Sequence, residues 1–225
     1  MVWVTSENDR ATATKNRMSR LQNEAEFYNS PNKTTHFIGF GQGGCNTLEL
    51  FFRKGINAKY TGITEPGNPT LSDGINFIPF TPPRFEAYKH GKETILKSDM
   101  NQQLIMPDVV KDLFIENHRY VLLAGLAGYT VTYMVEELTL WLNEIGKVFL
   151  TICSLPYFFE GDTRNKVAER SFVKMRSIYN FRYCDFNMLM DQFENDTKLG
   201  KAFEIGIEKL FDIYMNYIRN NNGKG

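Results

Sequence analysis

The sequence predicts a three-layer α/β domain with a parallel sheet, and three observations support this prediction. Short apolar segments alternate with longer amphipathic ones. The segments at 120–123 and 148–153 are apolar almost throughout, as in parallel strands that helices cover on both faces. A glycine-rich loop follows each of two apparent strands, at 39–46 and at 124–130. The chain is expected to end in a long central helix.

The spacing of apolar residues predicts the order of the elements. We expect strands at 35–40, 58–64, 76–80, 119–124, 147–154 and 181–184. We expect helices at 44–54, 101–117, 129–145, 162–178 and 197–219, with an irregular stretch at 81–100. The predicted organisation is a polar extension at 1–32 with a helix at 11–28, a nucleotide-binding α/β domain at 33–196, and the long helix with a polar tail at 197–225.

Composition narrows the classes of function. The 225 residues include 26 basic and 26 acidic side chains, so the zero net charge does not favour direct nucleic-acid binding. No apolar run reaches membrane-spanning length. The three cysteines lack metal-ligand spacing and the three histidines are scattered, so we expect no metal site and free thiols in a reducing, cytoplasmic compartment. Cys45 begins an expected helix, which can lower a thiol pKa, but no base is placed beside it, and we expect a small residue at a tight turn.

The last helix is apolar on most of its faces. Leu199, Phe203, Ile207, Leu210, Tyr214 and Tyr217 form one stripe. A helix of this kind is buried on most faces, so one face is expected to need a partner or a further domain.

The first loop reads Gly39-Phe-Gly-Gln-Gly-Gly-Cys-Asn46. Between a strand and a helix, such a loop presents backbone N–H groups to an anion. Its GxGxxG pattern, with Glu65 after the second strand, matches the fingerprint of dinucleotide-binding enzymes. An NAD-type enzyme is therefore one hypothesis, although that fold requires neither the second glycine loop nor the segment at 156–164.

Four segments, in this order, resemble motifs of the tubulin/FtsZ superfamily, which includes the TubZ-type filament proteins. The loop at 39–46 resembles its phosphate loop, and the loop at 124–133 resembles its AGMGGGTGTG signature. Pro156-Tyr-Phe-Phe-Glu-Gly161, followed by Arg164, resembles its PFxFEGxxR segment. Ala202-Phe203 resembles the AF pair of its central helix. The resemblance implies the Rossmann-like GTPase domain of this superfamily.

The resemblance also implies a site for GTP or GDP, with Mg²⁺ as a candidate ion. The residues implied near the phosphates are Gly41, Gln42, Gly43, Gly44, Gly128 and Thr130, and Asn46 would lie by the phosphates and base. The residues implied near the nucleoside are Glu160 at the ribose, Arg164 at the ribose or base, Asp185 or Asn187 at the base, and Phe203 against the guanine ring.

The second loop departs from the family pattern. Tyr129, Val131 and Tyr133 replace glycines of the signature, and Ala127 replaces a fourth. Bulky residues in left-handed geometry would each cost ~1–2 kcal/mol. Either the loop has another shape or phosphate binding is weakened. Ile207 also stands where the family has a base-contacting Asn or Asp.

Three hypotheses remain. The first is a guanine-nucleotide-binding cytoskeletal protein that assembles head to tail in a GTP-dependent way, with itself, a second tubulin-like domain or subunit, or an adaptor protein as partner. The second is a degenerate tubulin-like structural or interaction module with weak or no GTP binding. The third is the NAD-type enzyme. The resemblance implies GTPase activity, but the acidic loop that completes hydrolysis in the family follows the central helix, where this sequence ends, so no catalytic residue is assigned.

Overall fold

The protein is described by a computed structural model that covers residues 33–67, 71–81, 106–178, 180–194 and 196–222. The predicted helix at 11–28 and most of the irregular stretch at 81–100 lie outside these residues.

A six-stranded sheet forms the centre of the domain, and every strand pair is parallel. The strand order is β3-β2-β1-β4-β5-β6. The strands are β1 (Thr35–Phe40), β2 (Lys59–Thr64), β3 (Asn76–Pro79), β4 (Arg119–Gly125), β5 (Phe149–Leu155) and β6 (Phe181–Asp185). The predicted parallel sheet is confirmed, and β1, β4 and β5 are mostly buried, as their apolar sequences indicate.

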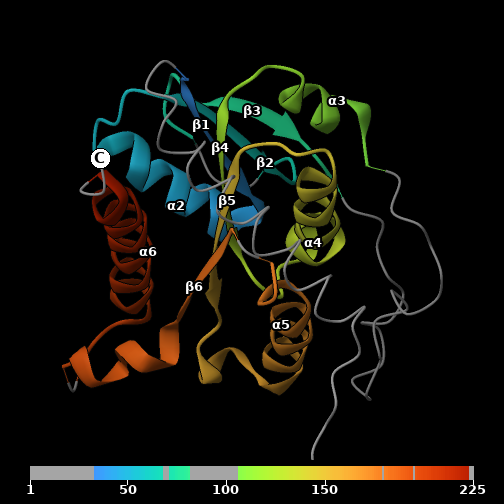
Figure 1. Ribbon diagram of the computed structural model, residues 1–225. Helices are drawn as coiled ribbons and strands as arrows, with labels where there is room; N and C mark the ends of the chain where they lie inside the picture. Colours follow the sequence, from blue (N-terminus) through green and yellow to red (C-terminus); the bar gives the residue numbers. More distant parts are fainter. Residues whose placement is uncertain (1–32, 68–70, 82–105, 179, 195, 223–225) are drawn as a thin grey trace, which may run out of the picture.

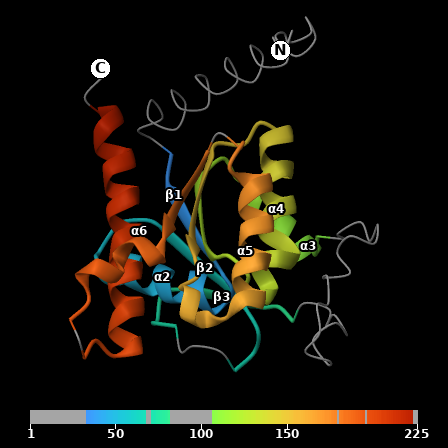
Figure 2. The same cartoon turned by 90° about the horizontal axis from the view of Figure 1, so that it is seen from below.

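Helices cover both faces of the sheet, which gives three layers (Figure 1; Figure 2). One face carries α2 (Gly41–Arg53) and α6 (Leu199–Asn222). The other carries α3 (Asp108–Lys111), α4 (Tyr129–Glu144) and α5 (Asp162–Met175). Among the described residues there are also short 3₁₀ helices, η3 (Asp112–Phe114), η4 (Phe158–Glu160) and η5 (Phe186–Gln192).

Neighbouring residues of one strand belong to different cores. Phe37 is buried in the core under α2 and α6, whereas Ile38 is buried in the core under α4 and α5. This follows from strand geometry, in which successive side chains point to opposite faces. A short apolar strand therefore contributes side chains to the cores on both faces of the sheet.

The strand order reverses direction at the boundary between β1 and β4. From β1 the chain builds outward to β2 and β3, and after β4 it builds the other way to β5 and β6. In open α/β sheets, ligands bind at the carboxyl edge of the sheet, next to such a switch point. Both glycine-rich loops start there, because one follows β1 and the other follows β4.

Several predicted element limits were wrong. The helix expected at 44–54 begins at Gly41, so the glycines lie in its first turns. Of the helix expected at 101–117, residues 101–105 lie outside the described residues, and the described part forms a single turn, α3, followed by η3, with Pro107 at the N-cap of α3. The helix expected to reach 178 ends at Met175. We did not anticipate η4 or η5.

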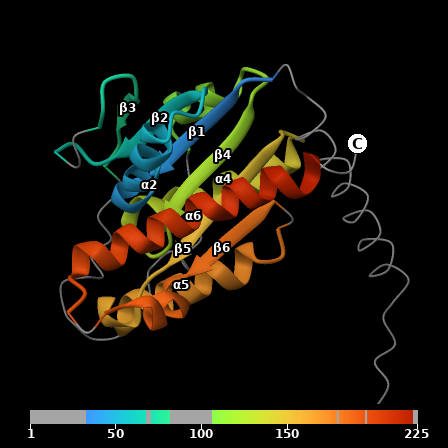
Figure 3. The same ribbon diagram turned by 90° about the vertical axis from the view of Figure 1, so that its left-hand side faces the viewer.

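The long helix α6 packs diagonally across the sheet beside α2 (Figure 3). Leu210, Tyr214 and Tyr217 are buried against the sheet, while Leu199 at its start is 58% exposed. The expected apolar stripe therefore divides into a buried second half and a partly exposed first half. In the parts of the chain described, no helix is both long enough and apolar enough to cross a membrane.

Candidate functional site

The two glycine-rich loops meet at the carboxyl edge of the sheet. A Cβ atom added to Gly43 would lie 3.6 Å from the Gly125 Cα, and one added to Gly41 would lie 3.5 Å from the Thr130 Cβ. The sequence predicted the two loops separately, and the structure places them against each other. Of the predicted phosphate residues, Gln42, Gly43 and Asn46 are exposed, and Thr130 is buried.

The N-termini of two helices, α2 and α4, lie at this edge. Neither α2 nor α4 has a side-chain hydrogen bond at its N-cap, Phe40 and Gly128 respectively. The first N–H groups of a helix have no partner within the helix, and the helix dipole makes this end positive. The edge therefore offers backbone donors to an anion.

The first loop contains glycine for two different reasons. A Cβ atom on Gly44 would lie 2.2 Å from the Leu123 carbonyl oxygen, so α2 can approach β4 this closely only through glycine. Gly41 has φ +65°, the left-handed region that favours glycine. Gly43 has neither restriction, since its added Cβ would make ordinary contacts. Its bare backbone leaves room at the exposed side of the loop.

The second loop avoids the strain expected at its bulky residues. Tyr129 begins α4 and Val131 lies within it, so both have helical backbone rather than the left-handed geometry considered above. The left-handed position falls on Ala127, at φ 67°, the one non-glycine residue with positive φ among those the structure describes. The strain expected at Tyr129 and Val131 is therefore absent, and whether phosphate binding is weakened stays a prediction.

Cys45 is buried in the first turns of α2, and its thiol donates to the Gly39 carbonyl over 3.6 Å. Burial raises the pKa of the Cys45 thiol to about 12. The lowering that a helix start can cause is therefore outweighed by desolvation. Cys45 thus lies within α2 rather than at the tight turn that the sequence indicated.

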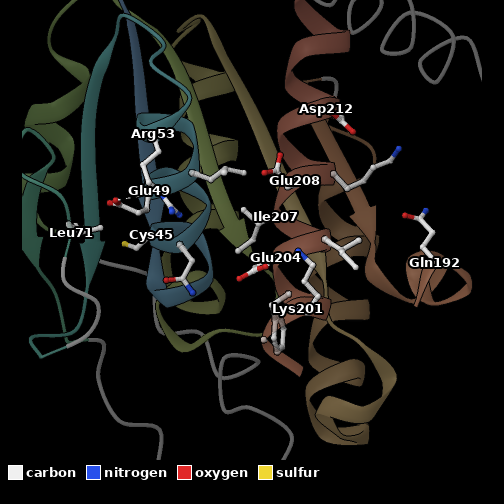
Figure 4. Close-up of a pocket in the computed structure, with 16 residues that line it drawn as sticks. Cys45, Glu49, Arg53, Leu71, Gln192, Lys201, Glu204, Ile207, Glu208 and Asp212 are labelled. Atoms are coloured by element: carbon white, nitrogen blue, oxygen red, sulfur yellow. Dashed lines mark hydrogen bonds and ion pairs between the residues drawn. The ribbon is translucent and has the colours of Figure 1, made fainter. Parts of the chain in front are cut away.

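A groove of about 870 Å³ runs between α2 and α6, continuing from the first loop (Figure 4). This volume falls within the range of about 300–1,000 Å³ that small-molecule sites occupy. Cys45 and Asn46 line it from α2, and Phe203 and Ile207 line it from α6. The predicted phosphate loop and the predicted base-packing residue thus border one groove.

Glu160 and Arg164 lie together at the start of α5. The Glu160 carboxylate accepts from the Tyr157 backbone N–H at 2.8 Å, and its other oxygen is 3.1 Å from the Arg164 Nε. The Glu160 side chain is mostly buried, and the Arg164 side chain is about half exposed. The structure thus brings the two predicted ribose residues together, and their roles remain predictions.

Asp185 and Asn187 bond to each other and to the backbone. An Asp185 carboxylate oxygen accepts from both the backbone N–H and the side-chain amide of Asn187, each at 3.0 Å. Asn187 also accepts from the Phe158 N–H at 2.7 Å and donates to the Pro156 carbonyl at 3.2 Å. This network joins the loops after β5 and β6. Neither side chain lines the groove.

Tyr157, which sequence reasoning did not single out, connects the loop after β5 to α6. Its side chain is fully buried, and its hydroxyl donates to the Ala202 carbonyl at 2.7 Å. Its ring lies 5.6 Å from the ring of Phe203, centroid to centroid. The sequence could have indicated this role, because Tyr157 stands before the Phe-Phe-Glu run and a buried tyrosine usually forms a hydrogen bond through its hydroxyl.

Glu204 and Glu208 are further groove residues that sequence reasoning missed. Their spacing of four residues places them on one face of α6, next to Phe203 and Ile207. The spacing of the two glutamates is visible in the sequence, but the sequence does not show that α2 forms the opposite wall of the groove.

No protein-family model matches the chain, and no curated protein matches it in sequence. Solved structures do match. FtsZ of M. jannaschii, solved as an empty dimer, superposes with a TM-score of 0.57 at 17% identity, over 95% of this chain and 59% of that chain. The chain has the tubulin/FtsZ fold.

Other solved structures with the tubulin/FtsZ fold also match. CetZ2 from Haloferax volcanii, in a GTPγS-bound protofilament, gives a TM-score of 0.56 at 16% identity, over 84% of this chain and 59% of that chain. TubZ from bacteriophage PhiKZ, also solved as a protofilament, gives a TM-score of 0.53 at 13% identity, over 82% of this chain and 57% of that chain. The chain therefore spans less than two thirds of the length of these proteins. At such identities the likeness shows the fold alone.

Proposed function

We propose that this protein binds a guanine nucleotide at the carboxyl edge of its sheet and self-associates head to tail when the nucleotide is bound. The observation that carries the proposal is the meeting of the two glycine-rich loops at the switch point, beside the groove between α2 and α6. A nucleotide needs an anion site and an adjoining slot for its base, and this edge supplies both.

The phosphates would lie over the starts of α2 and α4. Backbone N–H groups there can donate to phosphate oxygens, and the exposed backbone of Gly43 leaves the space that a side chain would fill. Gly128 and the Thr130 hydroxyl border the same space from the second loop. Mg²⁺ would accompany the phosphates and be held mainly by their oxygens.

The nucleoside would lie in the groove, with its base against Phe203. This ring is partly buried and lies against Tyr157, so it presents a supported aromatic surface. Glu160 can accept from a ribose hydroxyl only if it gives up part of its bonding to Tyr157 or Arg164.

Assembly is supported by exposed apolar side chains at the same edge. Phe158 and Phe159 are 60% and 43% exposed, and their rings lie 5.8 Å apart. Met188, which is 78% exposed, follows Asn187, whose side chain accepts from the Phe158 N–H. Exposed apolar side chains that cluster mark interaction surfaces. CetZ2 and TubZ were solved as protofilaments, and we extend that behaviour to this chain as part of the proposal. We place the protein in the cytoplasm, where its three free cysteines would stay reduced.

Thermal unfolding with and without GTP and Mg²⁺ tests nucleotide binding. A ligand at 100 times its dissociation constant stabilises a protein by ~2.7 kcal/mol, which raises the midpoint visibly. Sedimentation with and without GTP tests assembly. No shift at millimolar GTP would refute the binding proposal, and a shift with NADH alone would support an NAD-type enzyme.

A tubulin-like interaction module with weak or no nucleotide binding is the second candidate. It is favoured by the alanine at the left-handed position 127 and by the existing bonds of Glu160. Self-association or partner binding that is indifferent to GTP would support it.

A further inference from the structure

We propose that Glu204 selects the base of the bound nucleotide, by accepting hydrogen bonds from the N1–H and the 2-amino group of guanine. This inference rests on the proposed nucleotide site. It assigns guanine selectivity to a side chain for which the sequence resemblance gave no role.

Glu204 stands where a base stacked on Phe203 would present its edge. The two residues are adjacent in α6 and both line the groove. Figure 4 shows the Glu204 carboxylate projecting from α6 into the space toward α2. On the opposite wall, Asn46 offers an amide that can donate to the guanine O6 or N7.

The other groups considered for the base are less suited to this task. Asp185 and Asn187 bond to each other and to the backbone, and neither side chain lines the groove. Ile207, one helical turn beyond Phe203, presents only hydrocarbon. A guanine whose N–H groups met only this wall would lose ~1–3 kcal/mol for each unpaired group.

The remaining acidic side chains of the groove are engaged or distant. Glu49 accepts from the Ser72 backbone and hydroxyl and pairs with Arg53. Glu208 pairs with Lys54 at 3.0 Å. Asp212 lies two helical turns beyond Glu204 in α6. Among the described residues that line the groove, Glu204 is therefore the acceptor nearest to Phe203 in α6 that a base could reach.

Glu204 is available for this role. Its Oε2 lies 3.1 Å from the Lys201 Nζ, and the side chains of Glu204 and Lys201 are 68% and 64% exposed. A pair this exposed contributes little to stability, so Glu204 can exchange it for bonds to a base at small cost. In the part of the chain that the structure describes, the second carboxylate oxygen, Oε1, has no hydrogen-bond or ion-pair partner.

The chemistry distinguishes guanine from adenine. A carboxylate can accept from both guanine donors at once. Adenine offers it one amino group and the lone pair of N1, which repels a carboxylate. Sites that read a polar group by hydrogen bonding discriminate far more strongly than apolar pockets, so we expect GTP to bind at least about tenfold more tightly than ATP.

Titration of the wild type, Glu204→Gln and Glu144→Gln with GTP, ATP and XTP tests the inference. A glutamine can donate to the 2-carbonyl of xanthine, where guanine has its amino group. Glu204→Gln should therefore weaken GTP binding about tenfold or more and strengthen XTP binding. Glu144→Gln changes an exposed glutamate of α4 outside the groove, so it should bind the three nucleotides with the same order of affinity as the wild type. Unfolding curves confirm that both variants fold.

The outcomes separate the two proposals. If the wild type binds GTP selectively and Glu204→Gln leaves its preference unchanged, Glu204 does not read the base, but nucleotide binding stands. Equal binding of GTP and ATP by the wild type also overturns the inference alone. Binding of none of the three nucleotides overturns the proposed function together with it.

Discussion

The two edges of the sheet differ in how their polar groups are bonded. At the amino edge, side chains pair with one another: Lys59 bonds Glu116 at 2.6 Å, His118 contacts the same carboxylate, and His36 Nε2 bonds Thr61 at 2.9 Å, while the buried His36 Nδ1 has no partner among the described residues. At the carboxyl edge, the N-caps of α2 and α4 lack side-chain bonds. The comparison favours the carboxyl edge for an anion, because backbone N–H groups at helix starts attract negative charge.

The largest effect is expected from Gly44→Ala at the carboxyl edge. The new methyl would lie 2.2 Å from the Leu123 carbonyl oxygen, so α2 must move away from β4. We expect a loss of about 3 kcal/mol or more in the free energy of unfolding, measured by urea denaturation. Near-wild-type stability would show that glycine at this position is not required by packing.

At the amino edge, we expect acid to destabilise the protein through His36. Burial, with smaller contributions from His118 and Lys59, lowers the pKa of His36 to about 4, from 6.5. Between these values the unfolded chain binds the proton and the folded one does not, so stability rises with pH across this window. A shift of this size corresponds to about 3 kcal/mol, present above pH 6.5 and lost as the pH falls to 4.

His36→Gln removes this titration and retains a side chain that can bond Thr61. Unfolding at a series of pH values should show a flatter profile between pH 6.5 and pH 4 for the variant than for the wild type. Parallel profiles would mean that other groups cause the acid sensitivity.

Gly43→Val should remove the response to nucleotide without unfolding the protein. The Cβ atom would make ordinary contacts, the shortest at 3.6 Å to the Gly125 Cα, so we expect the domain to stay folded, while the two methyl groups of valine occupy the proposed phosphate site. The stabilisation of ~2.7 kcal/mol expected at 100 times the dissociation constant should vanish. The comparison is made by melting with and without GTP, with the exposed Asn143→Val as the control. A GTP response that survives in Gly43→Val would place the phosphates elsewhere.

The smallest effect is expected from Ala127→Gly in the second loop. Glycine relieves the left-handed strain at φ 67° but makes the unfolded chain more flexible, so the net gain should stay below about 1 kcal/mol. If the second loop contacts phosphate, closer approach of its backbone should also tighten GTP binding. Calorimetric titration of both proteins would detect this, and weaker binding would argue against the contact.

Much of the fold could be predicted from the sequence. Apolar runs such as that at 120–123 predicted β4 and its parallel neighbours, because a buried strand needs apolar residues on both faces. The ends of helices were harder to predict, because a residue of poor helix propensity can begin a helix, as Gly41 does in α2. The candidate site was predicted in part. The loops, Glu160, Arg164 and Phe203 were named from motifs, whereas Glu204 and Tyr157 were not, because their roles depend on elements distant in the chain.

The sequence by itself determined the α/β class, the order of the elements and the positions of the two glycine-rich loops, since these depend on local periodicity and turn chemistry. Only the tertiary structure decided which glycine serves which purpose. Gly44 is required by contact with a strand far away in sequence, whereas an added Cβ on Gly43 would make only ordinary contacts. It also decided that Asp185 is bonded internally while Glu204 faces the groove. Such assignments follow from distances between distant segments, which local sequence does not contain.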